Sequence, residues 1–435
     1  MRHTEWQHQT LSEILDITKG NSYRSVDLGP STTALVTLKS FERGGGYRYD
    51  GLKAFTGKYK TEQIVRPGEI VIALTDVTQA AELIGRPARV PVPVGFTTLV
   101  ASVDAGIVRP KSEVVDPRFL YYLLLSPELN AWTYAHTTGT TVLHLNPHAI
   151  MAFRAAIPPL AEQREIASIL GALDDKIELN RRMNATLEAM ARALFQSWFV
   201  DFDPVRAKAE GRQPVGMDAE TAALFPDSFE DSALGPIPTG WEVKAVPEII
   251  LVDPKRNLPK GSPARYLDMK NLPTEGHLAK ETVIRPLQSG AKFRNGDTLL
   301  ARITPCLENG KTGLVDFLDE GEVGWGSTEF IVLDPMPPLP KEFGYLLARS
   351  TAFREFAIQN MTGTSGRQRV PAESFGQFFI AIPPDAVSMA FGDVTKRLFA
   401  LINRHGGEVR RLELLRDSLI PVLLSGELRI GDVAA

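Results

Sequence analysis

Apolar residues recur in steps of four and three along residues 158–199. The series is Ile166, Leu170, Leu173, Ile177, Leu187, Ala191, Leu194 and Trp198, with Asn180 and Asn184 in its two gaps. This alternation is the heptad spacing of a helix that packs along a partner helix. At 1.5 Å per residue, a helix over residues 162–199 would be about 57 Å long. Such a helix is too long to be buried in a small domain, so we expect a strut between larger parts.

The second half of the chain repeats the first half in the same order. The matched positions are Trp6 with Trp241, Gly68 with Gly296, Gly139 with Gly363, and Leu173, Ile177, Leu187 and Leu194 with Leu398, Ile402, Leu412 and Leu419. Several matches in one order at a nearly constant separation indicate a duplication. The repeated unit is a globular domain followed by a long helix.

The repeat predicts an α+β fold with an internal pseudo-two-fold. We expect globular domains at 1–157 and 241–382, long helices at 158–199 and 383–428, and a linker at 200–240, which is rich in Pro, Gly, Asp and Ala. Two heptad helices on one chain bury their seams on each other, and an antiparallel coiled coil satisfies the connectivity.

The second predicted helix contains residues that disfavour helix. Gly406 and Gly407 each cost about 1 kcal/mol relative to Ala, and Pro421 is expected to end or kink the last turns. His405 aligns with Asn180, so both seams are polar near the middle. Such a layer ordinarily fixes the register of a coiled coil.

Within the first globular domain, residues 68–76 and 97–104 are predicted as buried strands. A helix is predicted to begin after Asp116, with Pro117 in its first turn.

Composition narrows the class of protein. The chain has 435 residues, of which 43% are hydrophobic and 23% charged, as in soluble globular proteins. A single cysteine, Cys306, excludes an intrachain disulfide and a multi-cysteine metal site, and fits a reducing cytoplasm. We expect neither a signal peptide nor a membrane span. The net charge of −4 does not by itself suggest a nucleic-acid partner.

No catalytic motif stands out. The chain lacks a phosphate loop that ends in Gly-Lys-Ser/Thr, and its histidines lack metal-ligand spacing. The sequence "NPHA" at Asn146 lacks the second proline and the aromatic residue of an adenine methyltransferase loop. A nuclease site drawn from Asp227, Glu242 and Lys244 would need Asp227 to leave the linker. We therefore predict no catalytic residue and no metal site.

Four polar loops contain residue types that are common in DNA-binding sites. Arginine, asparagine and glutamine are side chains that read base edges, although most arginines at DNA contact phosphate. The candidates lie in "ARITPCLENGKTG" and "TSGRQRV" of the second domain, and in "ALTDVTQ" and "TTVLHL" of the first. They are Arg367, Arg369, Arg302, Asn309, Lys311, Gln79, Thr141 and His144. Ordinary solvated turns remain the alternative.

The chain resembles the specificity subunits of type I DNA restriction–modification systems over nearly all of its length. The resemblance rests on the first helix from "IPPLAEQREIASIL" onward, on "ALGPIPTGWEV", on "GSTEFIVL" and on the domain–helix repeat. It implies two target-recognition domains, each reading one half of a bipartite asymmetric DNA site, and a coiled-coil ruler between them. The second helix begins "PPDAVSMAFGDV" and lacks the Ala-Glu-Gln entry, so we expect partner docking there to differ.

The resemblance also implies partners and cofactors. It implies a non-catalytic subunit that binds double-stranded DNA, two modification (methyltransferase) subunits and, through them, restriction subunits. S-adenosylmethionine would be bound by the modification partner, and ATP and Mg²⁺ by the restriction partner, with none on this chain. The alternative is an enzyme in its own right, a nuclease or methyltransferase whose site is unrecognised.

Overall fold

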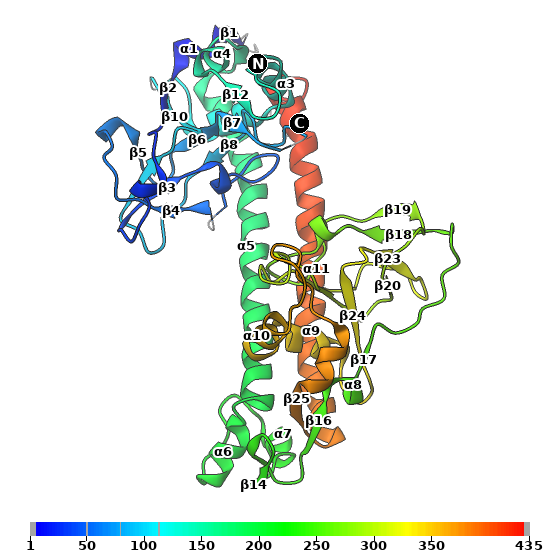
Figure 1. Cartoon of the computed structure of the whole chain (residues 1–435). Coiled ribbons are helices and arrows are strands. Elements are labelled where there is room, and N and C mark those ends of the chain that lie inside the picture. Colours follow the sequence, from blue (N-terminus) through cyan, green and yellow to red (C-terminus); the bar gives the residue numbers. More distant parts are fainter. Residues whose placement is uncertain (1–5, 49–50, 79, 112–113, 430–435) are drawn as a thin grey trace. The chain divides into compact units, whose positions relative to one another are not determined.

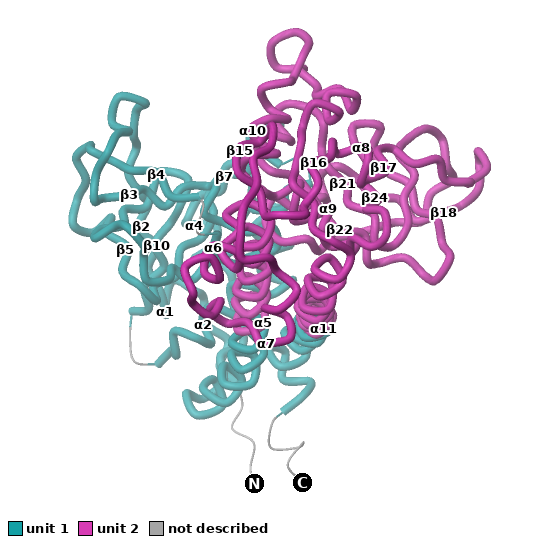
Figure 2. Tube along the Cα trace, turned by 90° about the horizontal axis from the view of Figure 1, so that it is seen from below, with its two compact units in different colours: residues 1–177, 411–435 teal, residues 178–410 magenta. Residues whose placement is uncertain are grey.

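The structure is a computed structural model that describes residues 6–48, 51–78, 80–111 and 114–429. Two compact units divide the chain (Figure 2): unit 1 comprises residues 1–177 and 411–435, and unit 2 comprises residues 178–410. Helix α5 (Leu160–Phe199) and helix α11 (Asp385–Leu424) each pass from one unit into the other (Figure 1).

Unit 1 is built from small, mostly antiparallel sheets. A two-stranded ribbon joins β1 (Gln7–Thr10) to β13 (Arg154–Ile157). One four-stranded sheet has the order β2 (Leu15–Lys19), β10 (Ala105–Pro110), β6 (Ile70–Ala73) and β8 (Pro87–Arg89). Another has the order β4 (Lys53–Ala54), β3 (Thr33–Val36), β9 (Thr98–Ala101) and β5 (Ile64–Val65), with β3 and β9 parallel. A third sheet has the order β11 (Thr137–Thr138), β12 (Leu143–Leu145) and β7 (Thr75–Asp76).

Short helices complete unit 1. They are α1 (Leu11–Ile14), α2 (Pro117–Leu125), α3 (Pro127–Ala135) and α4 (Pro147–Met151), with 3-10 turns η1 (Ser25–Asp27), η2 (Leu38–Ser40) and η4 (Thr61–Gln63). Helix α2 begins as predicted, because the Asp116 side chain accepts from the amides of Arg118 and Phe119. It ends at Ser126, whose side chain caps α3 in turn.

Unit 2 repeats this plan. Its strands form the ribbon β16 (Glu242–Ala245) with β25 (Phe379–Ile382), the sheet β17 (Ile250–Val252), β24 (Phe330–Pro335), β21 (Thr298–Ala301) and β22 (Thr312–Leu314), and the sheet β19 (Val283–Pro286), β18 (Pro263–Leu267), β23 (Gly324–Gly326) and β20 (Lys292–Phe293). Its shorter helices are α8 (Val246–Ile249), α9 (Lys341–Arg349), α10 (Thr351–Gln359), η5 (Met269–Asn271) and η6 (Ala372–Gln377).

The two long helices run antiparallel in each unit. In unit 1, Arg416 of α11 forms an ion pair of 2.8 Å with Asp174 of α5. Ile166 and Leu170 of α5 share a buried cluster with Leu423 of α11. In unit 2, the sequence of contacts again runs in opposite directions along the helices. Nδ1 of His405 lies at hydrogen-bond distance, 3.0 Å, from Oδ1 of Asn184. The ring centroids of Phe199 and Phe391 lie 4.8 Å apart. Every seam position named from the sequence is buried or half-buried, so the predicted coiled coil is confirmed.

The glycines of α11 have a packing role. A Cβ on Gly406 would lie 2.4 Å from Cδ1 of Leu278, so glycine lets the globular part of unit 2 contact the helix. The helix continues through Gly406, Gly407 and Pro421 to Leu424, so the expectation that Pro421 ends it is wrong. Packing outweighs the intrinsic cost of these residues.

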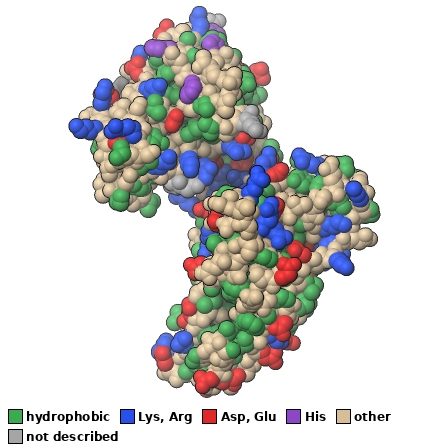
Figure 3. All heavy atoms as spheres, in the orientation of Figure 1, with side chains coloured by type: hydrophobic (Ala, Val, Ile, Leu, Met, Phe, Trp, Pro, Cys, Tyr) green, Lys and Arg blue, Asp and Glu red, His purple; other side chains and the backbone are tan. Residues whose placement is uncertain are grey.

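The segment predicted as a linker is folded. It contains α6 (Asp203–Ala209), α7 (Ala219–Ala223) and a hairpin of β14 (Phe229–Ser232) and β15 (Gly235–Pro238). Phe202, Phe225 and Ile237 are buried in the core of unit 2. Acidic side chains gather over this part of unit 2 (Figure 3, bottom).

The apolar end of α5 lies in the same core. Phe195, Trp198 and Phe199 are 2%, 4% and 2% exposed and pack on Phe343 and Phe391. The apolar sequence LFQSWF at residues 194–199 would also suit an exposed partner surface, but its aromatic side chains are buried within unit 2.

The first turn of α5 is fastened to the globular part of unit 1. Trp6 Nε1 donates to Glu162 at 3.0 Å. Gln163, which is 1% exposed, accepts from the amide of Asp116 at 2.8 Å and donates to the carbonyl oxygens of Val114 and Pro158. The Glu-Gln pair that α11 lacks therefore makes contacts within this chain.

Candidate nucleic-acid interface

Two loops of unit 2 that are about sixty residues apart in sequence form one surface. Arg369 pairs antiparallel with both Thr362 and Ile303. The amide of Thr304 donates to the carbonyl of Gln368 at 3.0 Å, and the amide of Val370 donates to the carbonyl of Arg302 at 2.9 Å. The backbone thus brings together the two second-domain loops that were selected from the sequence.

Unit 1 contains the same arrangement. His144 of β12 pairs with Thr138 of β11 and with Thr75 of β7. In backbone pairing these three residues take the places of Arg369, Thr362 and Ile303, although the ungapped repeat of the sequence aligns His144 with Gln368. The two units therefore present the same backbone platform with different side chains at its centre.

Glycines shape the turn of each platform. Gly139 has φ +96°, and a Cβ there would lie 2.1 Å from the carbonyl oxygen of Val142. Gly363 has φ +119°, and a Cβ there would lie 3.3 Å from the carbonyl oxygen of Arg367. Both positions require glycine for the turn itself.

Arg369 is held by a carboxylate that the sequence analysis missed. Its Nε donates to Oε2 of Glu329 at 2.9 Å, and its Nη2 donates to Oε1 at 2.7 Å. Its Nη1 also donates to the carbonyl of Arg367 at 3.2 Å. Hydrogen bonding to Glu329 raises the pKa of Arg369 further. The Arg369 side chain is 45% exposed and that of Glu329 is 24% exposed.

Arg367 lies on the exposed turn of the same loop. Its amide donates to the carbonyl of Thr364 at 3.0 Å. Among the described residues, no side-chain hydrogen bond or ion pair holds its guanidinium.

Arg302 lines an open hollow of about 550 Å³ in unit 2. Lys255, Arg256 and Lys292 also line this hollow, together with the carboxylate of Asp253. Nε of Arg302 is buried without a hydrogen-bond partner in the described part of the chain. The hollow therefore has a basic lining next to the platform.

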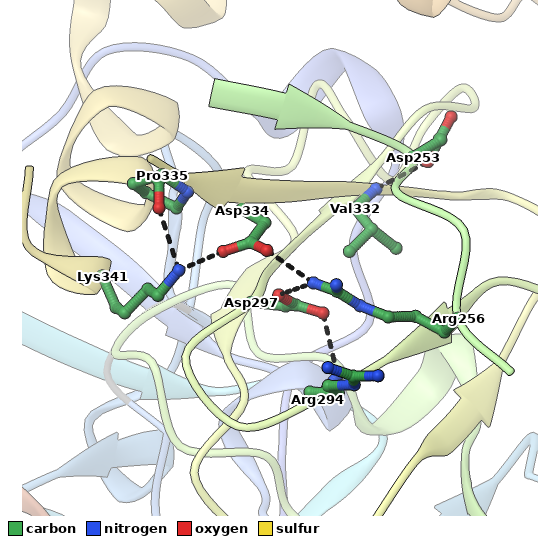
Figure 4. Close-up of polar contacts among 8 residues, drawn as sticks. All are labelled: Asp253, Arg256, Arg294, Asp297, Val332, Asp334, Pro335 and Lys341. Atoms are coloured by element: carbon green, nitrogen blue, oxygen red, sulfur yellow. Dashed lines mark hydrogen bonds and ion pairs between the residues drawn. The ribbon is translucent and has the colours of Figure 1, made fainter. Parts of the chain in front are cut away.

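Arg256 is committed to the fold rather than to the hollow. Figure 4 shows its guanidinium between Asp297 and Asp334, at 2.7 and 2.6 Å. Lys341 also pairs with Asp334. Burial raises the pKa of Asp334, but the two cations outweigh it and the pKa is lowered.

The other two candidates of unit 2 are Lys311, which is half-buried, and Asn309, which is exposed. Lys311 donates to the carbonyl oxygens of Met269 and Lys270 at 2.5 and 3.2 Å, which ties its loop to η5. Asn309 is exposed in the turn, where its amide donates to the carbonyl of Pro305.

The candidates of unit 1 are exposed where the structure describes them. Thr141 lies in the turn between β11 and β12, and His144 lies on β12. Gln79 lies outside the described residues. Asp76, the last residue of β7, is fully buried and accepts from the amides of Thr78, Leu83 and Ile84. Burial raises the pKa of Asp76, but these hydrogen bonds outweigh it, so the pKa is lowered and the carboxylate anchors the loop.

The alternative nuclease site has no support in the geometry. Glu242, whose side chain is 71% exposed, pairs with Lys244 at 2.8 Å. In the ranges that the structure describes, no group of three His, Cys, Asp or Glu side chains is arranged to hold a metal ion.

No described helix is long and apolar enough to span a membrane.

Comparisons with known proteins give one consistent result. The family model for the type I restriction modification DNA specificity domain matches residues 3–189. The specificity subunit of the type I restriction enzyme HindI of Haemophilus influenzae is 25% identical over 377 residues, which are 76% of this chain and 81% of the relative. The chain is therefore similar to type I specificity subunits along most of its length.

A second relative and a solved structure extend this result. The MjaIX specificity subunit of Methanocaldococcus jannaschii is 25% identical over 359 residues, 78% of this chain and 77% of the relative. The crystal structure of a type I restriction–modification S subunit from M. genitalium matches with a TM-score of 0.54 and 13% identity, over 97% of this chain and 96% of that one. Because the sequence identity to the M. genitalium S subunit is only 13%, this likeness shows a shared fold.

Proposed function

We propose that this chain is the DNA sequence-specificity subunit of a type I restriction–modification complex. Each unit reads one half of a bipartite, asymmetric site in double-stranded DNA, and the paired helices α5 and α11 set the distance between the half-sites. The chain itself carries out no catalysis.

The repeated platform is the observation that carries this proposal. The same backbone pairing places His144 at the centre in unit 1 and Arg369 at the centre in unit 2. Equivalent scaffolds with different central side chains favour two different base sequences, because direct readout depends on side-chain donors and acceptors. The basic hollow around Arg302 supports phosphate contact near the platform of unit 2.

Modification subunits, two in the complex, are the proposed partners, and restriction subunits join through them. Exposed apolar side chains on the long helices support a docking surface; they include Met183 and Met190 of α5 and Leu414 and Leu415 of α11. S-adenosylmethionine then belongs to the modification partner, and ATP with Mg²⁺ belongs to the restriction partner.

A co-expression experiment tests the proposal. A host without endogenous methylation receives this chain, a modification subunit from the same system, or both. Only the pair is expected to methylate a bipartite sequence. Site-specific methylation or cleavage by the purified chain alone would favour the enzyme alternative and contradict the proposal.

A further inference from the structure

We propose that Arg369 reads a guanine in the half-site recognised by unit 2, and that Glu329 makes this arginine selective for the base. This inference rests on the proposed function, and it assigns a base class to one position and a specificity role to a residue outside the sequence candidates.

The contacts of Arg369 leave two of its N–H donors free to bind a base. An arginine has five N–H donors in a rigid plane. Nε, Nη2 and Nη1 of Arg369 each commit one hydrogen, the first two to Glu329 and the third to the carbonyl of Arg367. One hydrogen remains on each terminal nitrogen. Two such donors in a plane match O6 and N7 of guanine in the major groove.

Glu329 also fixes the plane of these donors. It lies directly before β24, whose residues are buried throughout, and its side chain is only 24% exposed. Arg369 is fixed from the other side by backbone pairing with Ile303 and Thr362. A guanidinium that is already oriented loses less side-chain entropy when it binds a base.

The carboxylate disfavours the competing role, which is phosphate contact. A phosphate that approaches Arg369 also approaches the negative charge of Glu329, which is bonded to the guanidinium. The two opposite charges offset each other, so the Arg369–Glu329 pair contributes little net attraction for the DNA backbone. Guanine is neutral and experiences no such repulsion. Arg367, which no carboxylate holds among the described residues, suits phosphate contact better.

The test uses the complex of the full chain with its modification subunit and DNA duplexes that carry its methylation motif. Each base pair of the second half-site is replaced in turn, and binding is measured across a series of salt concentrations. The variants are Arg369→Ala, Arg369→Lys and Glu329→Gln, with thermal unfolding as a check on folding. Glu322→Gln is the matched control, because Glu322 pairs with Arg265 at 3.4 Å elsewhere in unit 2 and its side chain is 23% exposed.

Arg369→Ala and Arg369→Lys are expected to lose about tenfold to a hundredfold discrimination at one guanine. Their slope of log affinity against log salt should stay near that of the parent. Glu329→Gln is expected to weaken the same discrimination at least fivefold and to steepen the slope by up to about 0.9, as the released arginine gains a phosphate contact. Glu322→Gln should change neither quantity.

Two results would overturn the inference. One is an unchanged base preference in both Arg369 variants. The other is a uniform loss of affinity for all duplexes with a slope reduced by about 0.9, which is the signature of a phosphate contact. If the parent complex has no sequence preference at all, the proposed function fails as well, so the two failures are distinguishable.

Discussion

The phenol of Tyr345 donates a hydrogen bond of 2.7 Å to Oε1 of Glu188, in a buried contact that joins helix α9 to helix α5 in unit 2. Tyr122 of α2, at the matching position of unit 1, also donates to a carboxylate of α5, here Asp174 at 2.6 Å. In each unit, therefore, a tyrosine on the recognition fold binds a carboxylate on the long helix.

Tyr345→Phe is expected to lower the free energy of unfolding of unit 2 by about 1–3 kcal/mol, because it leaves a buried carboxylate without one of its donors. Chemical denaturation of the purified chain measures the change. Tyr134→Phe serves as the control, since Tyr134 is 56% exposed. An equal effect of the two substitutions would show that the contact with Glu188 is not stabilising.

Asp76→Asn is expected to remove a pH dependence of stability from unit 1. The pKa of Asp76 is lowered in the folded chain, so its ionised form stabilises the fold above the unfolded value of about 3.9. That contribution is lost as the pH falls through the folded pKa. Unfolding free energies measured from pH 6 to pH 3 should fall more steeply in the parent than in the variant. Equal slopes for the parent and Asp76→Asn would contradict this assignment.

Arg367→Ala is expected to reduce the salt slope of specific binding by about 0.9 without changing base preference, as the loss of one phosphate contact would. Combined with Arg369→Ala, it should alter recognition of the second half-site alone, because both residues belong to unit 2. Binding to duplexes mutated in either half-site provides the measurement. A change in preference at the first half-site would contradict the assignment of one half-site to each unit.

One heptad inserted after Lys176 and one after Glu413 are expected to lengthen the spacer of the DNA site. These points lie opposite each other, as the contact between Asp174 and Arg416 shows, and seven residues preserve the seam. The insertion adds roughly 10.5 Å, which corresponds to about three base pairs at about 3.4 Å each. It also rotates the half-sites by about 100°, at roughly 10.5 base pairs per turn, so activity should fall. Methylation-site sequencing that returned the parental spacer would show that the helices are not the ruler.

The parts of the fold that depend on local periodicity were predictable from the sequence. The seam from Ile166 to Trp198 follows from the heptad pattern, and the cap at Asp116 follows from the residues beside it. The repeat further indicated which loops are equivalent. His144 pairs with Thr75 in unit 1 and Arg369 pairs with Ile303 in unit 2, so the two loops of each unit form one surface.

Features set by tertiary contacts were not predictable in this way. Glu329 lies forty residues from Arg369 in sequence, and no local pattern links them. Composition made residues 200–240 resemble a linker, although Phe202, Phe225 and Ile237 were an available signal of a core. The aromatic end of α5 is apolar whether it meets a partner or its own fold, so sequence alone could not place Trp198 in the core.

Methylation-site sequencing of a host that expresses this chain with its modification subunit tests the central claim most directly. Three parallel cultures express the modification subunit alone, with the parent chain, or with the Arg369→Ala variant. The account predicts a bipartite methylated motif that depends on this chain, with relaxed preference at one guanine of one half-site in the variant culture. A motif that is the same without this chain would contradict the account, as would a continuous motif with no spacer.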